Sequence, residues 1–202
     1  MQDAQAEEQI RDEFERVVSV VEEMTGLKSR WRGEVRVVQP QEQLFSHRQF
    51  TARKDWDCSF SIVATLTNDD ARWRTIIHEA LHSVSVGLNA QDYETYLGWE
   101  EATVEALQRL IRPSILARLG VSVEEALFVR VESTWRYEHY VIALRQIATE
   151  FPGVSGEEFF RTLLGVRLRD RKAYIFAWGR RAASDFEKFK RSYANASGHL
   201  SL

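Results

Sequence analysis

The sequence is poor in the residues that mark extracellular, fibrous and membrane-embedded proteins. Its 202 residues include one cysteine, three prolines and ten glycines. Cys58 alone cannot form an internal disulfide, and the low glycine and proline counts exclude collagen-like and low-complexity chains. No run approaches the roughly 20 consecutive apolar residues that span a bilayer, and the mean hydropathy is −0.37. We therefore expect a folded protein without a membrane segment.

The composition is typical of a globular domain, with 44% hydrophobic and 28% charged residues. A chain of this length fits a single domain over residues 1–202. The N-terminal residues MQDAQAEEQIRDEF are acidic and polar, whereas a secretory signal peptide is basic and then apolar. Together with the lone cysteine, this favours a cytoplasmic protein.

The charge is nearly balanced overall but uneven along the chain. A formal net charge of −3 gives no general attraction to nucleic acid. From Arg161 to the C-terminus, however, ten Lys or Arg face three Asp or Glu. The favoured interpretation is a solvated helix face whose cations pair with the acidic N-terminal helix. The alternative is a surface for nucleic acid or an acidic partner.

Hydrophobic periodicity predicts a helix-rich chain with a small sheet near its beginning. Apolar residues three or four apart predict an amphipathic helix over 4–24. Alternating residues predict strands over 34–38 and 58–67, with a polar loop containing His47 between them. Further helices are expected over 70–87, 99–112, 122–130, 133–150, 156–165 and 170–193, and Pro113 is expected to end the second of these. The fold class is therefore α+β, mostly helical, with a sheet of two to four strands.

The motif that carries chemistry lies in the helix expected over 70–87. His78, Glu79 and His82 form the pattern HExxH. Residues four apart lie on one helix face, so both imidazoles can bind one metal ion, and Glu79 is offset by about 100° and suits a general base. Zn²⁺ is the expected ion, although Mn²⁺, Co²⁺ and Ni²⁺ accept the same ligands. Two histidines on the surface of an ordinary helix can form the same pattern. A third ligand at a suitable distance along the chain would therefore support a metal site.

An acidic cluster, Gly98-Trp99-Glu100-Glu101-Ala102-Thr103-Val104-Glu105, begins the next expected helix. Glu101 follows His82 by nineteen residues and begins the segment Glu-Ala-Thr-Val-Glu. With HExxH, this arrangement resembles the gluzincins, the thermolysin-like zinc metallopeptidases, over residues 58–110. The resemblance implies that Glu101 is the third metal ligand and that Glu105 accepts a hydrogen bond from His78.

Glu100 competes with Glu101 for the place of third ligand, because the two are adjacent. Glu101 is favoured, since only Glu101 has an acidic residue one helical turn further on. Both acids also suit the first turn of a helix, where the helix dipole favours negative charge without any metal.

The resemblance also implies an architecture and an activity. It implies one zincin-like domain with an N-terminal helix over 4–24, a core over 58–110 and a C-terminal helical subdomain over 114–193. The expected activity is zinc-dependent hydrolysis of peptide bonds in a peptide or protein substrate. Because no export signal is recognised and a broad protease would endanger the cytosol, a narrow substrate range is expected. In such a fold the strand over 58–67 pairs with the extended substrate.

One part of the family's machinery has no match in the sequence. No residue stands in a motif that identifies the donor to the developing oxyanion. Tyr137, His139 and Tyr140 are candidates, although aromatic residues at helical spacing belong more often to the core. The alternative function is therefore a catalytically silent binding or scaffold protein of the same fold, in which a metal only ties two helices together.

Overall fold

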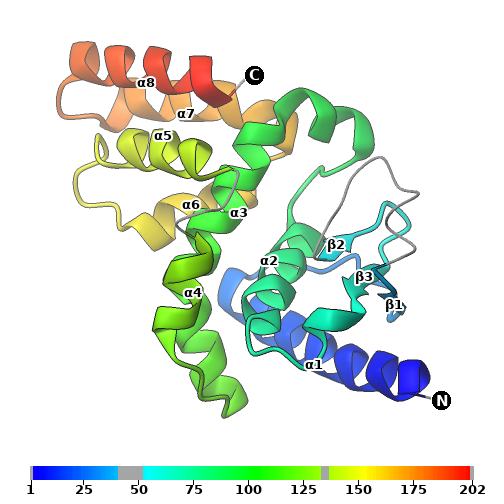
Figure 1. Ribbon diagram of the computed structural model, residues 1–202. Helices are drawn as coiled ribbons and strands as arrows, with labels where there is room; N and C mark the ends of the chain where they lie inside the picture. The colour runs from blue at the N-terminus through cyan, green and yellow to red at the C-terminus, as the bar shows by residue number, and fades with distance from the viewer. Residues whose placement is uncertain (1, 41–51, 133–136, 201–202) are drawn as a thin grey trace. The chain divides into compact units, whose positions relative to one another are not determined.

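The computed structural model describes residues 2–40, 52–132 and 137–200 (Figure 1). These residues form a mostly helical α+β fold with one small mixed sheet, which confirms the predicted fold class. They divide into two compact units, one of Met1–Val84 with Arg112–Phe128 and one of Ser85–Ile111 with Val129–Leu202. Within the described residues, no helix has both the length and the apolar run needed to cross a bilayer.

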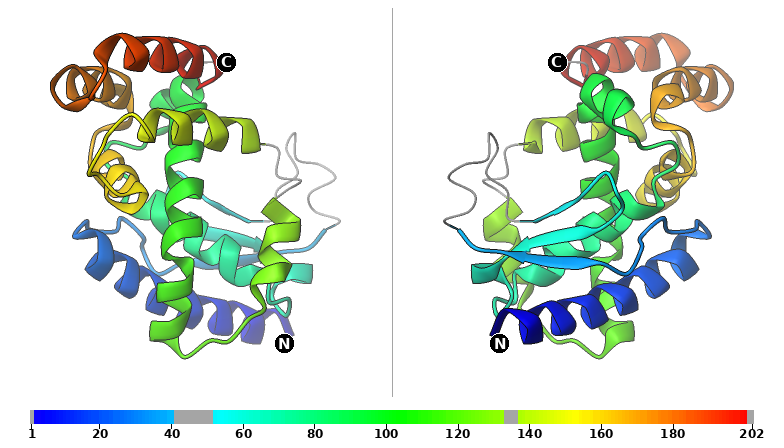
Figure 2. Two further views of the ribbon diagram at one scale, coloured as in Figure 1. Left: turned by 90° about the vertical axis from the view of Figure 1, so that its left-hand side faces the viewer. Right: turned by 90° about the vertical axis from the view of Figure 1, so that its right-hand side faces the viewer.

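The first unit contains a three-stranded sheet in the order β1-β3-β2. β3 (Phe60–Val63) lies between β1 (Val35–Val38), to which it is parallel, and β2 (Ala52–Lys54), to which it is antiparallel. α1 (Gln2–Thr25) packs on β1, α2 (Arg72–Val84) packs on β2, and the two helices contact each other. Both helices therefore cover the same face of the sheet, as Figures 1 and 2 show.

The apolar stripe predicted for the first helix forms the core of this unit. Its members are fully buried: Ile10, Phe14, Val17 and Val21. The Phe14 ring stacks on Phe60 of β3 with centroids 4.5 Å apart. Beside this core, Glu13 of α1 forms a bidentate ion pair with Arg72 at the start of α2. The N-terminal helix thus holds both the sheet and α2.

The sheet differs from the prediction in two ways. The strand expected over 58–67 ends at Val63 and continues as the 3-10 helix η2 (Ala64–Leu66). Because β1 and β2 occupy both of its edges, the prediction that this strand pairs with a substrate is wrong. β2 was not predicted, since three residues are too few for an alternation to be recognised. The expected loop residue His47 lies outside the described residues.

Pro113 does not end its helix, contrary to the sequence prediction. α3 (Ala90–Leu119) continues through it for six residues. Proline lacks the N–H that would bond to the fourth preceding carbonyl, so other contacts must stabilise the helix beyond it. Those contacts come from α1: Arg16 donates to the carbonyl of Leu119 at 2.8 Å, and Arg118 pairs with Glu23 at 2.7 Å. One of the three places where the chain passes between the two units falls at Ile111 and Arg112, just before this proline.

Five further helices follow α3 in the described part of the chain. They are α4 (Glu125–Glu132), α5 (Glu138–Ala148), α6 (Gly156–Leu164), α7 (Arg171–Ala182) and α8 (Phe186–Leu200), with the 3-10 helix η3 (Leu168–Asp170) before α7. The single helix expected over 170–193 is thus two helices. Asp185 ends the break between them by capping α8, since its Oδ1 accepts the Lys188 N–H at 2.9 Å. In Figure 1, α5 and α7 lie beside α8.

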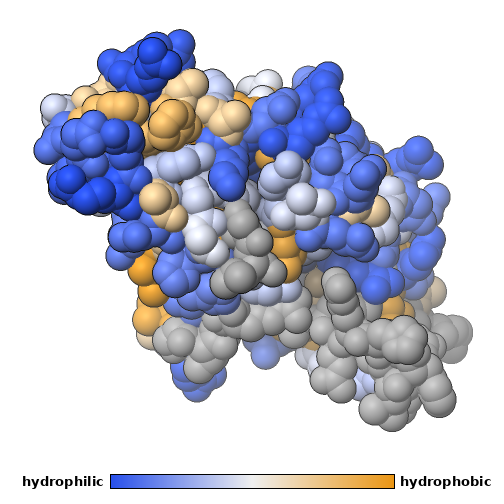
Figure 3. Space-filling view, turned by 90° about the horizontal axis from the view of Figure 1, so that it is seen from above, coloured by the Kyte–Doolittle hydropathy of each residue, from blue (hydrophilic) through white to orange (hydrophobic). Residues whose placement is uncertain are grey.

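Some of the Lys and Arg side chains of the basic segment 161–202 form ion pairs within the second unit. Lys188 pairs with Glu150 at 3.0 Å and Lys190 with Glu187 at 2.7 Å. Eight Lys or Arg side chains of residues 161–202 are exposed: Arg161, Arg167, Arg169, Lys172, Arg180, Arg181, Lys188 and Arg191. Figure 3 shows a mostly hydrophilic surface over α7 and α8, at its upper left, with small apolar areas between charged ones. A nucleic acid or acidic partner for this surface stays a prediction.

A glycine allows the close approach of α7 and α8. A Cβ atom on Gly179 would lie 2.1 Å from Cζ of the fully buried Phe189. We predict that Gly179→Ala lowers the free energy of unfolding by about 1–2 kcal/mol, because overpacking costs about 1–3 kcal/mol and helix propensity returns up to about 1 kcal/mol. Urea denaturation measures this change. Gly198→Ala is the control, since no atom lies within 4 Å of its Cβ position; equal stability of both variants would contradict the packing argument.

Candidate metal centre

The HExxH motif lies on a buried helix. His78, Glu79 and His82 are all buried in α2, which excludes the interpretation as two surface histidines. The Nε2 atoms of His78 and His82 lie 3.1 Å apart, with the two rings nearly perpendicular at 78°. Two nitrogens bound at about 2.1 Å to one tetrahedral zinc ion would be about 3.4 Å apart. The two imidazoles therefore already have the spacing of ligands to one ion.

Glu101 of α3 completes a group that can hold a metal ion. His78, His82 and Glu101 each offer one ligand atom, these atoms lie within 4.8 Å of one another, and all three residues are buried. Among the described residues, this is the one such group of three or more His, Cys, Asp or Glu side chains. Two imidazoles and a carboxylate fit Zn²⁺, and they also accept other first-row divalent ions.

Glu100, the competing candidate, is held elsewhere. Its Oε2 accepts hydrogen bonds from Nη1 of Arg171 at 2.6 Å and from the Ser85 hydroxyl at 2.9 Å. Glu100 and Arg171 have no exposed surface. Burial lowers the pKa of Arg171, and the charge and hydrogen bond of Glu100 oppose this change. Glu100 thus serves as the partner of a buried cation.

A tyrosine that the sequence did not indicate contacts Glu101, the predicted third ligand. The Tyr93 hydroxyl donates a hydrogen bond to Oε1 of Glu101. Eight residues of straight helix would place these two positions about 12 Å apart along the axis. They meet because α3 is kinked at Tyr96, whose φ of −121° and ψ of 28° are not helical. No periodicity in the sequence marks this kink, so no sequence signal linked Tyr93 to the site.

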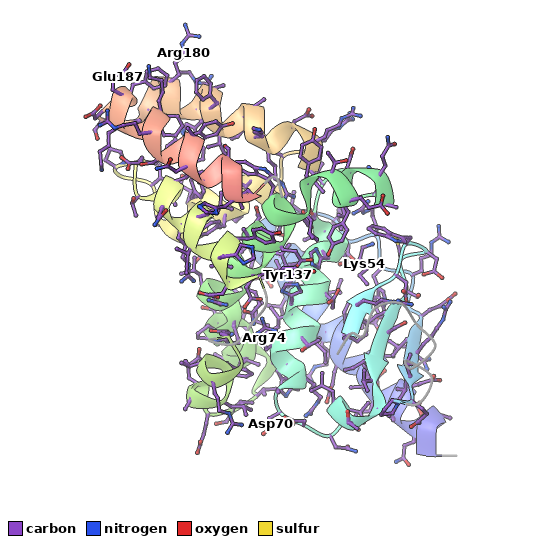
Figure 4. The ribbon with its side chains drawn as sticks, turned by 45° about the horizontal axis from the view of Figure 1, so that its top comes forward. Lys54, Asp70, Arg74, Tyr137, Arg180 and Glu187 are labelled. Atoms are coloured by element: carbon purple, nitrogen blue, oxygen red, sulfur yellow. The ribbon has the colours of Figure 1, made fainter. Side chains whose placement is uncertain are left out.

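The predicted general base is held by the edge strand. Oε2 of Glu79 accepts the backbone N–H of Lys54 in β2 at 2.6 Å. The next N–H, that of Asp55, donates to the carbonyl of Ser59, the residue before β3, so alternation directs the Lys54 N–H away from β3. Glu79 therefore lies at the outer edge of β2. In Figure 4, Lys54 marks this strand and Arg74 marks α2.

Glu105, the predicted partner of His78, is fully buried. Its Oε1 accepts a hydrogen bond from Nε of Arg109 at 2.8 Å, and Arg109 also pairs with Glu138 at 2.6 Å. Although burial opposes the change, Glu138 and Glu105 raise the pKa of Arg109. Glu105 is thus the partner of a cation, while its hydrogen bond to His78 stays a prediction.

The three aromatic candidates for oxyanion donor pack on one another at the start of α5. The rings of Tyr137 and Tyr140 stack with centroids 5.6 Å apart, and the centroid of His139 lies 3.9 Å from that of Tyr140. Tyr140 is buried, and Figure 4 labels Tyr137. Such packing is typical of core aromatics, and a catalytic role for any of them stays a prediction.

We predict that His78→Ala and Glu101→Ala each weaken Zn²⁺ binding by more than about 100-fold, since even loss of a residue that only supports a ligand costs about 10–100-fold. Competition against a chromophoric chelator measures the affinity. His199→Ala and Glu94→Ala are matched controls at exposed positions and should bind as the unaltered protein does. Retained affinity in either ligand variant would remove that residue from the site.

Tyr93→Phe should weaken Zn²⁺ binding by about tenfold, because the hydroxyl that orients one carboxylate oxygen of Glu101 is lost while the ring remains. The same chelator competition measures it. Tyr96→Phe, three residues further along α3, is the matched control. An unchanged affinity in Tyr93→Phe would show that Glu101 needs no support from this bond.

Comparison of the chain with protein-family models, with curated proteins and with solved structures found no match. The resemblance to the gluzincins therefore depends on the motif residues alone, and a function has to be argued from the geometry of this site.

Proposed function

We propose that the protein is a metal-dependent peptidase, with zinc as the favoured ion. His78, His82 and Glu101 bind the metal, and Glu79 is the general base. The observation that carries this proposal is the buried group of two imidazoles and one carboxylate, with the Glu79 carboxylate on the same helix as the imidazoles. The expected substrate is a peptide or protein, and the expected location is the cytoplasm.

The composition of the group supports a catalytic site over a structural one. Structural zinc sites are closed by four protein ligands, usually with cysteines, whereas catalytic sites use three protein ligands and keep one open position. The group offers two histidines and one glutamate. When bound in such a site, a zinc ion supplies Lewis acidity and lowers the pKa of a water molecule to about 7.

The position of Glu79 suits proton transfer. A carboxylate can take a proton from water and return it to the amine that leaves when a peptide bond is cut. The Lys54 N–H binds Oε2 of Glu79 at 2.6 Å, and this bond fixes the plane of the carboxylate, so that Oε1 is oriented as well. Glu79 is thus a positioned base on a rigid helix.

The strand beside Glu79 supports a peptide as the substrate. β2 pairs with β3 along one edge, and the Lys54 N–H at its other edge meets Glu79. An extended peptide that follows this outer edge would bring its own backbone next to the base, by the addition of a strand to a sheet. β2 thereby takes the role that the sequence assigned to residues 58–67.

A catalytically silent binding or scaffold protein is the second candidate function. The hydrogen bond of Tyr93 to Glu101 favours it, because a hydroxyl committed to a ligand would be less free to stabilise a developing oxyanion. In that case the metal would only tie the two ligand-bearing helices together. The exposed cations of the C-terminal helices would then be the surface for an acidic partner, a reading we do not favour.

Glu79→Gln separates the two functions. We predict that this variant binds Zn²⁺ with unchanged stoichiometry but cleaves a library of fluorogenic peptides about 10²–10⁴-fold more slowly, the usual contribution of a general base. A chelator should abolish cleavage by the unaltered protein, and added Zn²⁺ should restore it. Glu94→Gln on the exposed surface of α3 is the control. Equal cleavage by Glu79→Gln, or cleavage that a chelator leaves intact, would contradict the proposed peptidase.

A further inference from the structure

Ser85, Glu100 and Arg171 form a buried polar cluster, and the first two lie close to predicted metal ligands in the sequence. Nη1 of Arg171 donates to Oε2 of Glu100 at 2.6 Å, and Nη2 donates to the Ser85 hydroxyl at 2.6 Å. That hydroxyl donates in turn to the same oxygen of Glu100, at 2.9 Å. Each pair of the three residues is therefore bonded directly, without access to solvent.

The cluster joins the chain just after one ligand to the chain just before another. Ser85 follows the last residue of α2 and is three residues from His82, while Glu100 directly precedes Glu101. Arg171 is the first residue of α7. Its guanidinium therefore links the segment that leaves the histidine helix, the ligand-bearing part of α3 and the C-terminal helices.

Backbone hydrogen bonds hold the segment after α2 in the same place. Val86 donates to the carbonyl of Leu164 at 3.1 Å and accepts the N–H of Leu168 at 3.1 Å. Nε of Arg171 donates to the carbonyl of Val166 at 3.2 Å. The connection between α6 and α7 thus binds the chain directly after α2, and Arg171 contributes to these contacts.

The fixed geometry of arginine makes this cluster a rotational constraint on α3. A guanidinium is planar and presents its donors in a rigid fork. One arm of this fork, Nη1, binds Oε2 of Glu100, and the other arm, Nη2, binds the Ser85 hydroxyl, which binds the same oxygen. These bonds hold the Glu100 side chain in one direction from α3. Because successive helical residues differ by about 100°, the side chain of Glu101 must then point to another side of α3 than Glu100 does.

We propose that Arg171 and Ser85 are positioning residues of the metal centre, which hold Glu100 so that Glu101 is the carboxylate presented to the metal. This inference rests on the proposed function, since it assumes that the group binds a metal. It extends the centre beyond the helices that carry the ligands to α7, seventy residues after Glu101. The alternative is an ion pair that serves stability alone.

The test compares this ion pair with another whose residues lie at least six positions from any predicted ligand in the sequence. Arg171→Met with Glu100→Gln removes both charges together, since a single substitution would leave a buried charge unpaired. Arg72→Met with Glu13→Gln removes a matched pair, bidentate and with both side chains 12% exposed. Ser85→Ala keeps the Arg171–Glu100 pair and loses the hydrogen bonds of the Ser85 hydroxyl to Arg171 and Glu100. Chelator competition gives the Zn²⁺ affinity, the absorption spectrum of bound Co²⁺ reports the coordination geometry, and urea gives the stability without metal.

We expect the Arg171→Met, Glu100→Gln protein to bind Zn²⁺ about tenfold more weakly or worse and to show an altered Co²⁺ spectrum. Ser85→Ala should weaken binding by about three- to tenfold without loss of the fold. The Arg72→Met, Glu13→Gln protein should lose stability but keep its affinity and spectrum.

Two results would overturn the inference, and they differ from a failure of the proposed function. If Ser85→Ala, and the Arg171→Met, Glu100→Gln protein wherever it folds, bind Zn²⁺ like the unaltered protein, the cluster has only a structural role. If the Arg72→Met, Glu13→Gln protein loses as much affinity, the effect follows stability and is not specific. If the unaltered protein itself binds no metal, the proposed peptidase fails together with this inference.

Discussion

Burial of charged and polar side chains on two helices is the constraint on which the site depends. α2 buries both histidines and the glutamate of its motif, and α3 buries three glutamates within six residues. A buried polar group without a partner destabilises a fold by several kcal/mol, and a buried charge by more. So many buried polar and charged side chains are compatible with a stable fold only when each of them has a well-placed partner. The metal group His78, His82 and Glu101 is the part of it that a cation can satisfy.

The partners of these groups differ in kind. A backbone N–H of β2 binds Oε2 of Glu79, and the Tyr93 hydroxyl binds Oε1 of Glu101. Arg171, by contrast, holds Glu100 by a full ion pair. Neighbouring glutamates thus differ in chemistry because their partners differ.

Local patterns predicted the parts of the fold that local physics decides. The apolar residues of α1 and the two histidines of HExxH recur at the period of a helix. Both features could therefore be predicted without knowledge of any tertiary contact. Two predictions were wrong because packing decides these features. The helix does not end at Pro113, since contacts with α1 hold the end of α3. The helix expected over 170–193 is two helices, which pack closely where Phe189 contacts Gly179. The sequence did not indicate three residues that contact the site. Tyr93 reaches Glu101 only because of the kink in α3, and Lys54 reaches Glu79 from a strand of only three residues. Arg171 binds Glu100 across a separation of 71 residues.

The sequence by itself determined the mostly helical α+β class and the two histidines one turn apart, with a glutamate between them, because helical geometry fixes the relation of residues four apart. It narrowed the third ligand to Glu100 or Glu101 and favoured Glu101, because Glu101 has an acidic residue one helical turn further on. The tertiary structure separates the two, because a buried arginine binds the Glu100 carboxylate and Glu101 lies in the group with the imidazoles. That choice depends on which charges meet away from water, and only the folded chain brings them together.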